Sequence, residues 1–211
     1  ALNFTDYDVE VSKTSLIFNF LYNEIKIGIE LSFDKVSELK VDGLTINYSE
    51  ETGYKFIIDE NKEIEISGTL IMSSLTISGK GSLSITGSVT ILKSLLVENE
   101  STLKVTGTTG DAVNVNGEGK LQLFGNVIVN SAAGKTGINI HNPNCAIYIT
   151  DTSRVTVSGG AYTIAHFDTG NKVKVYYPKT ASLANKKITS SDGNVLLSYG
   201  ATNKIEFVAE E

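Results

Sequence analysis

A five-residue pattern of hydrophobic and polar positions recurs along the chain: aliphatic, any residue, aliphatic, any residue, glycine. In a strand, residues two apart point to the same side, so each aliphatic pair marks one buried side. The glycine that follows can adopt the positive φ that a sharp corner requires. We therefore interpret each copy as a short strand followed by a bend. The seven copies begin at Ile64, Leu75, Leu83, Leu103, Val113, Leu121 and Val155.

The spacing of such strands predicts the architecture. A hairpin-built sandwich spaces its strands at about 8–12 residues but does not predict a persistent longer repeat. A solenoid, in which the chain winds so that equivalent strands stack, accounts for both the repeat and its pattern. We therefore predict an all-β fold, a single-stranded parallel β-helix with coils of about 17–20 residues and an N-terminal β cap. Taking one strand per coil, the strands begin at Leu44, Ile64, Leu83, Leu103, Leu121, Ile138, Val155 and Val173.

The aromatic residues indicate where the regular coils end. Nine lie in residues 1–56 and seven in residues 148–211, with only Phe124 between them. Large rings suit irregular end structure, whereas a narrow stacked core accepts aliphatic side chains. We predict an N-terminal β cap at 1–40, with strands at 15–22 and 24–33, a parallel β-helix at 41–200, and a C-terminal strand or tail at 201–211.

Charge and hydropathy narrow the classes of partner that the protein can bind. The chain has 18 Lys and Arg against 24 Asp and Glu, for a net charge of −6, and residues 1–63 alone carry −7. A surface this poor in basic residues argues against nucleic acid as a partner. No segment approaches the roughly 18 consecutive apolar residues of a membrane span. The sequence leaves the oligomeric state open.

The residues capable of catalysis are few and scattered. The only cysteine, Cys145, excludes an internal disulfide, and with His141 and His166 it offers a poor zinc set, so we interpret it as a small buried thiol. The only arginine, Arg154, reads as a solvated strand residue rather than the base of a lyase. General acid and base catalysis requires carboxylates focused on one cleft. We find no such pair among residues 64–167, where Glu98 and Glu100 read as solvent-facing turn residues, and we expect no enzymatic activity.

An acidic cluster at Glu50, Glu51, Asp59, Glu60 and Glu63 offers the oxygen ligands that calcium prefers. Its spacing is not that of an ordered calcium loop, so we interpret it as an acidic turn. Threonine-rich outward positions also raise the question of ice binding. Lys, Glu, Gln and Asn interrupt the threonine row, which argues against that function.

Two segments carry a family resemblance: Leu75–Gly87, LTISGKGSLSITG, and Gly137–Ile164, GINIHNPNCAIYITDTSRVTVSGGAYTI. They resemble secreted bacterial right-handed parallel β-helix proteins of the pectate-lyase-like type. Within that group they are most similar to the non-catalytic carbohydrate-binding proteins of anaerobic and gut bacteria. The resemblance implies a secreted or cell-surface bacterial protein that binds plant or host polysaccharide, in some members with calcium. It implies no other cofactor.

Four tyrosines are the candidate ligand-binding residues: Tyr148, Tyr162, Tyr176 and Tyr177. Sugars stack their apolar faces on aromatic rings, and tyrosines on a rigid sheet supply that arrangement. The competing interpretation is that these rings close the C-terminal end of the coil. We therefore expect a polysaccharide-binding or adhesive surface protein. The alternatives are a structural spacer or fibre segment of a surface or phage appendage and, with less support, a polysaccharide lyase.

Overall fold

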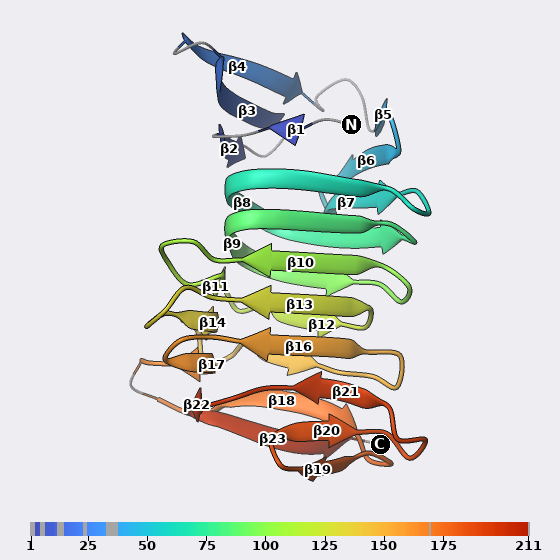
Figure 1. Ribbon diagram of the computed structural model, residues 1–211, viewed down its shortest axis with the longest axis vertical. Coiled ribbons are helices and arrows are strands. Elements are labelled where there is room, and N and C mark those ends of the chain that lie inside the picture. The colour runs from blue at the N-terminus through green and yellow to red at the C-terminus, as the bar shows by residue number, and fades with distance from the viewer. Residues whose placement is uncertain are drawn as a thin grey trace.

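The computed structural model describes residues 3–4, 7–11, 15–22, 25–32, 38–168 and 170–210, with side chains for residues 38, 40 and 42 onward in these ranges. Every regular element in the described residues is a strand, and the strands form one curled, partly parallel sheet. The predicted all-β class is therefore confirmed. Figure 1 shows the strands stacked along the long axis, with β3 and β4 at one end and β19 and β23 at the other.

Three runs of parallel strands, here named ladders A, B and C, make up most of the sheet. Two long strands, β8 (Glu63–Gly79) and β9 (Ser82–Val97), bend twice and contribute to all three ladders. Ladder A begins with their first segments and aligns the buried residues Ile64, Leu83, Leu103, Val127, Val155 and Leu197. It continues through β10 (Thr102–Thr106), β13 (Asn126–Asn130), β16 (Arg154–Ser158) and β21 (Val195–Ser198).

Ladder B contains the middle segments of β8 and β9. Its register aligns Leu70, Val89, Val113, Ile138, Ile164 and Thr202, of which the first five are buried. It continues through β11 (Val113–Val115), β14 (Thr136–Ile140), β17 (Tyr162–His166) and β22 (Thr202–Asn203).

Ladder C begins at β7 (Gly53–Ile58) and contains the last segments of β8 and β9. Its register aligns Tyr54, Leu75, Leu95, Leu121, Ile147, Val175 and Phe207. It continues through β12 (Lys120–Leu123), β15 (Ala146–Tyr148), β18 (Val173–Pro178) and β23 (Ile205–Glu210).

Antiparallel strands lie at both ends of the ladders. The predicted pair of N-terminal strands is confirmed by β3 (Ser15–Tyr22) and β4 (Ile25–Ser32), and the turn expected at Tyr22-Asn23 extends outside the described residues. β1 (Asn3–Phe4) and β2 (Tyr7–Val11) pair in parallel with β8, and β5 (Glu38–Val41) precedes β6 (Leu44–Ser49). At the other end, β19 (Ser182–Ala184) and β20 (Lys187–Thr189) form a hairpin beside β21. The boundaries at residues 40 and 200 stay predictions.

Alternation along each strand separates a core from an outer surface. Leu83 and Ile85 are 0% and 1% exposed, whereas Thr86, next to Ile85, is exposed. Aliphatic residues of one strand therefore stack on those of the next, about 4.8 Å along the axis. This stacking buries a continuous apolar column between the three ladders.

The predicted repeat is correct for three strands and wrong beyond them. Ile64, Leu83 and Leu103 are successive positions of ladder A, but the next position is Val127, 24 residues on, and then Val155. Leu121 and Val173 belong to ladder C, Ile138 belongs to ladder B, and Leu44 lies in the antiparallel β6. The connections lengthen after β10. The same aliphatic pattern occurs in the strands of all three ladders. A repeat counted from one such strand to the next one about 19 residues on therefore passes from one ladder to another.

The glycines that end the pattern act in two ways. Gly79 has φ +85°, as the corner interpretation predicts. Gly117 lacks a positive φ. There, a Cβ atom would lie 1.5 Å from the carbonyl oxygen of Leu92, so the absence of a side chain lets successive turns of the backbone approach.

Candidate functional site

The four candidate tyrosines do not form one platform. Tyr148 and Tyr176 are register partners on the outer side of β15 and β18 in ladder C, and Tyr177 follows Tyr176 in the chain. Tyr162 begins β17 in ladder B, where it is paired with Thr136. The structure therefore brings three of these residues to ladder C and separates the fourth from them.

Tyr148 and Tyr176 stack on each other. Their ring centroids are 5.1 Å apart with an interplanar angle of 22°, and the Nζ atom of Lys120 lies 5.7 Å from the Tyr148 centroid. Both rings are half-buried. Each ring covers one face of the other, so that face is closed to a ligand. Burial raises the pKa of Tyr148, and the neighbouring Tyr176, Glu210 and Cys145 add to this effect.

Tyr177 belongs partly to the core. It is half-buried and packs against the core cluster, as do Tyr199 and Phe207, whose rings stack with centroids 4.7 Å apart. These three residues lie in the last turns of the chain, where β18 and β23 pair. This packing of Tyr177 is what the competing interpretation, closure of the C-terminal end, expects. Tyr199 and Phe207, which the sequence analysis did not single out, pack against the core as well.

Tyr162 contacts a different ring. Its centroid is 5.6 Å from that of Phe167 at an interplanar angle of 72°, an edge-to-face geometry. Phe167 is 50% exposed and lies in the connection between β17 and β18. This pair is a separate aromatic contact on ladder B.

A hollow of about 410 Å³ lies where the strands of ladder C end. The carboxyl ends of β12, β15, β18 and β23 meet there, because parallel strands end at the same edge. Tyr148 and Tyr177 both contribute to its wall. The remaining lining residues are Phe124, Ile149, Thr150, Asp151, Pro178, Lys179, Thr180 and Glu210.

The hollow combines apolar and polar chemistry. Phe124 and Tyr148 supply aromatic surface, the threonines supply hydroxyl groups, and Asp151 and Glu210 supply exposed carboxylates. Asp151 and Glu210 are 59 residues apart in the chain, and no local motif links them. They come together because β15 and β23 each pair with β18, one on either side. The arrangement can hydrogen-bond a polyhydroxylated ligand while contacting its apolar side.

Searches against protein-family models, curated proteins and solved structures found no match. No helix among the described residues is long and apolar enough to cross a membrane.

Glu98, expected to face solvent in a turn, is partly exposed but also has two side-chain partners. Its Oε1 accepts a hydrogen bond from Lys55 Nζ at 2.8 Å, and its Oε2 accepts one from Ser78 Oγ at 2.6 Å. Partial burial raises the pKa of Glu98, but the hydrogen bonds from Lys55 and Ser78 and the charge of Lys55 more than offset this and leave the pKa below its ordinary value. These contacts tie β7, β8 and the end of β9 together, which is a structural role.

Other titratable residues also have structural environments. Cys145 is 2% exposed, and burial raises the pKa of its thiol to about 12. His166 is 0% exposed, and its Nδ1–H donates to the carbonyl oxygen of Ile140 at 2.7 Å, whereas His141 is exposed. Arg154 is exposed and donates to the carbonyl oxygens of Asp151 and Ser153.

No group of three or more metal-ligating side chains occurs among the described residues. The acidic cluster is spread over separate turns, since Glu50 and Glu51 follow β6 whereas Asp59 and Glu60 follow β7. Glu63 instead accepts hydrogen bonds from Lys104 Nζ at 3.0 Å and from Ser84 Oγ at 2.5 Å. These two hydrogen bonds hold the pKa of Glu63 below its ordinary value.

Proposed function

We propose that the chain is a non-enzymatic, secreted or cell-surface bacterial protein that binds polysaccharide through the hollow at the end of ladder C. We further propose that its strands form a single-stranded parallel β-helix with an N-terminal β cap. The parallel registers of the three ladders support the architecture. The bacterial origin and the location rest on the resemblance of Leu75–Gly87 and Gly137–Ile164 to secreted β-helix proteins.

The observation that carries the proposal is the composition of the hollow. A site of about 410 Å³ falls within the range of small-ligand pockets. A sugar ring has an apolar side, which suits the aromatic surfaces of Phe124 and Tyr148. Its hydroxyl groups suit Asp151, Glu210 and the two threonines as hydrogen-bond partners. Together these groups match the two-sided chemistry of a carbohydrate.

The environment of the carboxylates supports binding rather than hydrolysis. A general acid in a glycosidase has a pKa raised by an apolar environment. Asp151 and Glu210 are both exposed, and neither is enclosed by apolar side chains in this way. We therefore assign them hydrogen-bonding roles toward sugar hydroxyl groups.

A structural spacer is the second candidate, and one observation favours it. The rings of Tyr148 and Tyr176 cover each other's faces, and Tyr177 packs against the core. Aromatic rings used in this way stabilise the end of a rod and need no ligand. The two functions therefore differ in whether the hollow binds anything.

Affinity electrophoresis against soluble polysaccharides and pull-down on insoluble ones, each with calcium and with a chelator, tests the proposal. We expect at least one polysaccharide to retard the wild type. The double variant D151N/E210Q should lose this retardation, whereas the control D192N/E60Q, which removes the same charges at other exposed positions, should keep it. Failure of the wild type to bind any polysaccharide would leave the spacer function standing.

A further inference from the structure

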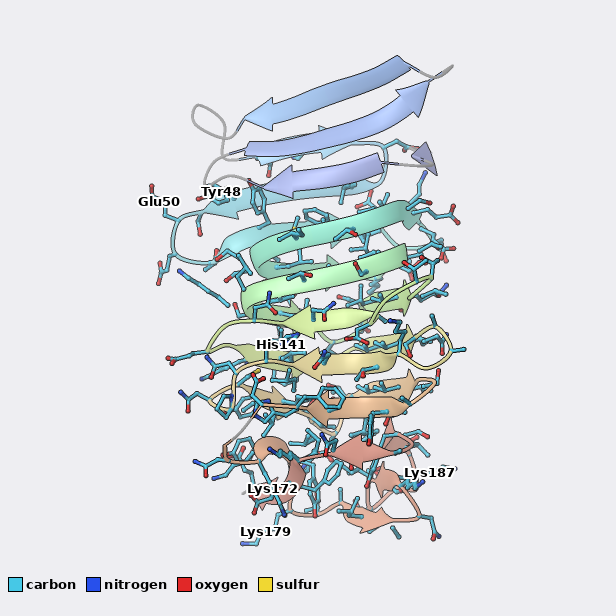
Figure 2. All side chains as sticks on the ribbon, turned by 90° about the vertical axis from the view of Figure 1, so that its left-hand side faces the viewer. Tyr48, Glu50, His141, Lys172, Lys179 and Lys187 are labelled. Atoms are coloured by element: carbon cyan, nitrogen blue, oxygen red, sulfur yellow. The ribbon has the colours of Figure 1, made fainter. Side chains whose placement is uncertain are left out.

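The chain contains two histidines, and the fold encloses one of them. His166 is the last residue of β17 and is 0% exposed, whereas His141 is exposed. Figure 2 labels His141 on the turns between the two ends of the molecule. Histidine is the side chain whose charge ordinarily changes between pH 5 and pH 8. These two residues are therefore the ones expected to respond to pH in that range.

Hydrogen bonding fixes which nitrogen of the neutral His166 ring carries the proton. Nδ1 lies 2.7 Å from the carbonyl oxygen of Ile140, and a carbonyl oxygen only accepts, so Nδ1 is the donor. Nε2 is buried and has no hydrogen-bond partner among the described residues. Protonation of Nε2 would create a buried donor without an acceptor and would add a buried positive charge.

No acidic residue in the described part of the chain is buried with His166 to compensate such a charge. β14 and β22, which pair with β17 on either side, contain no titratable residue. On β17 itself, Tyr162 lies at the opposite end of the strand. The charged residues of the other strands packed against β17, and those beside its end, are all exposed: Arg154 on β16, Glu206 and Glu210 on β23, and Asp168 and Lys204. The protonated ring can therefore reach a counter-charge only by leaving the core.

The strand that carries His166 also holds residues 200–203, here named the β22 segment. The main-chain carbonyl oxygen of His166 accepts a hydrogen bond from Asn203 Nδ2 at 2.9 Å. At the start of the segment, Gly200 N donates to Thr163 Oγ1 at 2.9 Å, and Thr163 N donates to the carbonyl oxygen of Ala201 at 2.8 Å. Among the described residues, β22 pairs only with β17. Displacement of His166 therefore loosens one end of this segment.

We propose that His166 is an acid-sensitive switch for the pairing of β17 with the β22 segment. At neutral pH the uncharged ring stays in the core and the segment stays paired. At acidic pH the ring takes up a proton and moves to water, where the exposed carboxylate of Asp168 can pair with it, and the β22 segment opens. The open form binds one more proton than the closed form, so the closed form loses stability as the pH falls. The switch does not depend on the sugar site.

Urea unfolding between pH 8 and pH 5 tests the proposal with two matched single variants. His166→Asn keeps an N–H donor for the Ile140 carbonyl oxygen but cannot be protonated, and His141→Asn removes the exposed ring. Below about pH 6.5, the unfolding equilibrium constant of the wild type and of His141→Asn should rise by up to about tenfold per pH unit, the limit for one proton. That of His166→Asn should stay nearly constant. A wild type without this dependence, or a dependence that His141→Asn removes, would overturn the proposal.

Hydrogen exchange locates the opening. At pH 5.5, amides of β17 and of the β22 segment should exchange faster in the wild type than in His166→Asn, whereas those of β8 and β9 should exchange equally. At pH 8 the two proteins should be alike. Faster exchange throughout the wild type at pH 5.5 would contradict a switch confined to this segment.

NMR of the wild type provides the test if His166→Asn fails to fold. While the β22 segment is closed, the His166 ring should keep its neutral Nδ1–H form over the pH range in which His141 becomes protonated. Protonation of both rings with the segment still closed would overturn the proposal.

Discussion

Tyr148 and Tyr176 occupy matching register positions on β15 and β18, and their rings stack with centroids 5.1 Å apart. The two stacked rings have different positions relative to the hollow. Tyr148 lines the hollow, whereas Tyr176 does not contribute to its wall and supports the Tyr148 ring from one face. In the proposed site, Tyr148 contacts the ligand, and Tyr176 holds the Tyr148 ring in position.

The assignment of inner and outer faces predicts opposite outcomes at adjacent residues. Ile85→Asp places a charge in the core, where Ile85 is 1% exposed, and should cost more than about 4 kcal/mol of unfolding free energy. Thr86→Asp faces solvent and should change it by less than about 1 kcal/mol. Urea unfolding measures both changes. Similar losses for the two variants would show that the faces are wrongly assigned.

The close approach of successive turns predicts a strong effect at one glycine. A Cβ atom on Gly119 would lie 1.1 Å from the carbonyl oxygen of Lys93, so Gly119→Ala forces the backbone to move and should cost about 2 to 3 kcal/mol. Gly110 has no atom within 4 Å of its Cβ position, and Gly110→Ala should be nearly neutral. Thermal unfolding compares the two. A neutral Gly119→Ala would argue against this packing of the turns.

The contacts of Glu98 predict a specific acid sensitivity. Its pKa is lower in the folded chain than in the unfolded chain, so its stabilising contribution is present above the unfolded value of about 4.3 and is lost as the pH falls through the folded value. Because the side chain is 37% exposed, we expect about 1 kcal/mol or less. Between pH 6 and pH 3, Glu98→Gln should therefore lose less stability than the wild type. Urea unfolding at the two pH values measures both losses, and equal losses for the two proteins would contradict a stabilising role for these contacts.

The repeated pattern predicts strands well because aliphatic alternation depends only on neighbouring residues. Leu83 and Ile85, for example, point inward as their spacing requires. Which strands stack on one another depends on the length of each connection. The connection between Thr106 and Val113 lengthens one turn of the chain. The aliphatic pattern of a strand does not indicate which ladder that strand joins.

The candidate site was predictable only in part. Tyr148 and Tyr177 were accessible to sequence reasoning because surface tyrosines suit sugar binding in general. Glu210 was not, since it lines the hollow with Asp151 only because β23 pairs with β18 after the intervening hairpin of β19 and β20. Tyr162 lies on ladder B, away from the hollow, because it begins β17 and pairs with Thr136, and its sequence neighbourhood does not show which ladder it joins.

The packing of Tyr177 predicts a stability effect that its neighbour lacks. Tyr177→Ala removes a ring packed against the core and should cost about 2 to 3 kcal/mol. Tyr176→Ala removes an outward ring and should cost about 1 kcal/mol, mainly through the lost stack. Differential scanning calorimetry gives both melting temperatures. A larger loss for Tyr176→Ala would contradict the assigned orientations.

The most direct test of the proposed function is to measure polysaccharide affinity and melting temperature together for Tyr148→Ala. The ligand is the polysaccharide that most strongly retards the wild type in affinity electrophoresis. We predict a loss of about 1 kcal/mol or more in binding free energy, roughly a fivefold or greater rise in Kd. The unfolding free energy should fall by about 1 kcal/mol, as for Tyr176→Ala, because both variants lose the same ring stack. An unchanged Kd, or a large fall in melting temperature without any detectable ligand, would contradict a sugar site at this hollow.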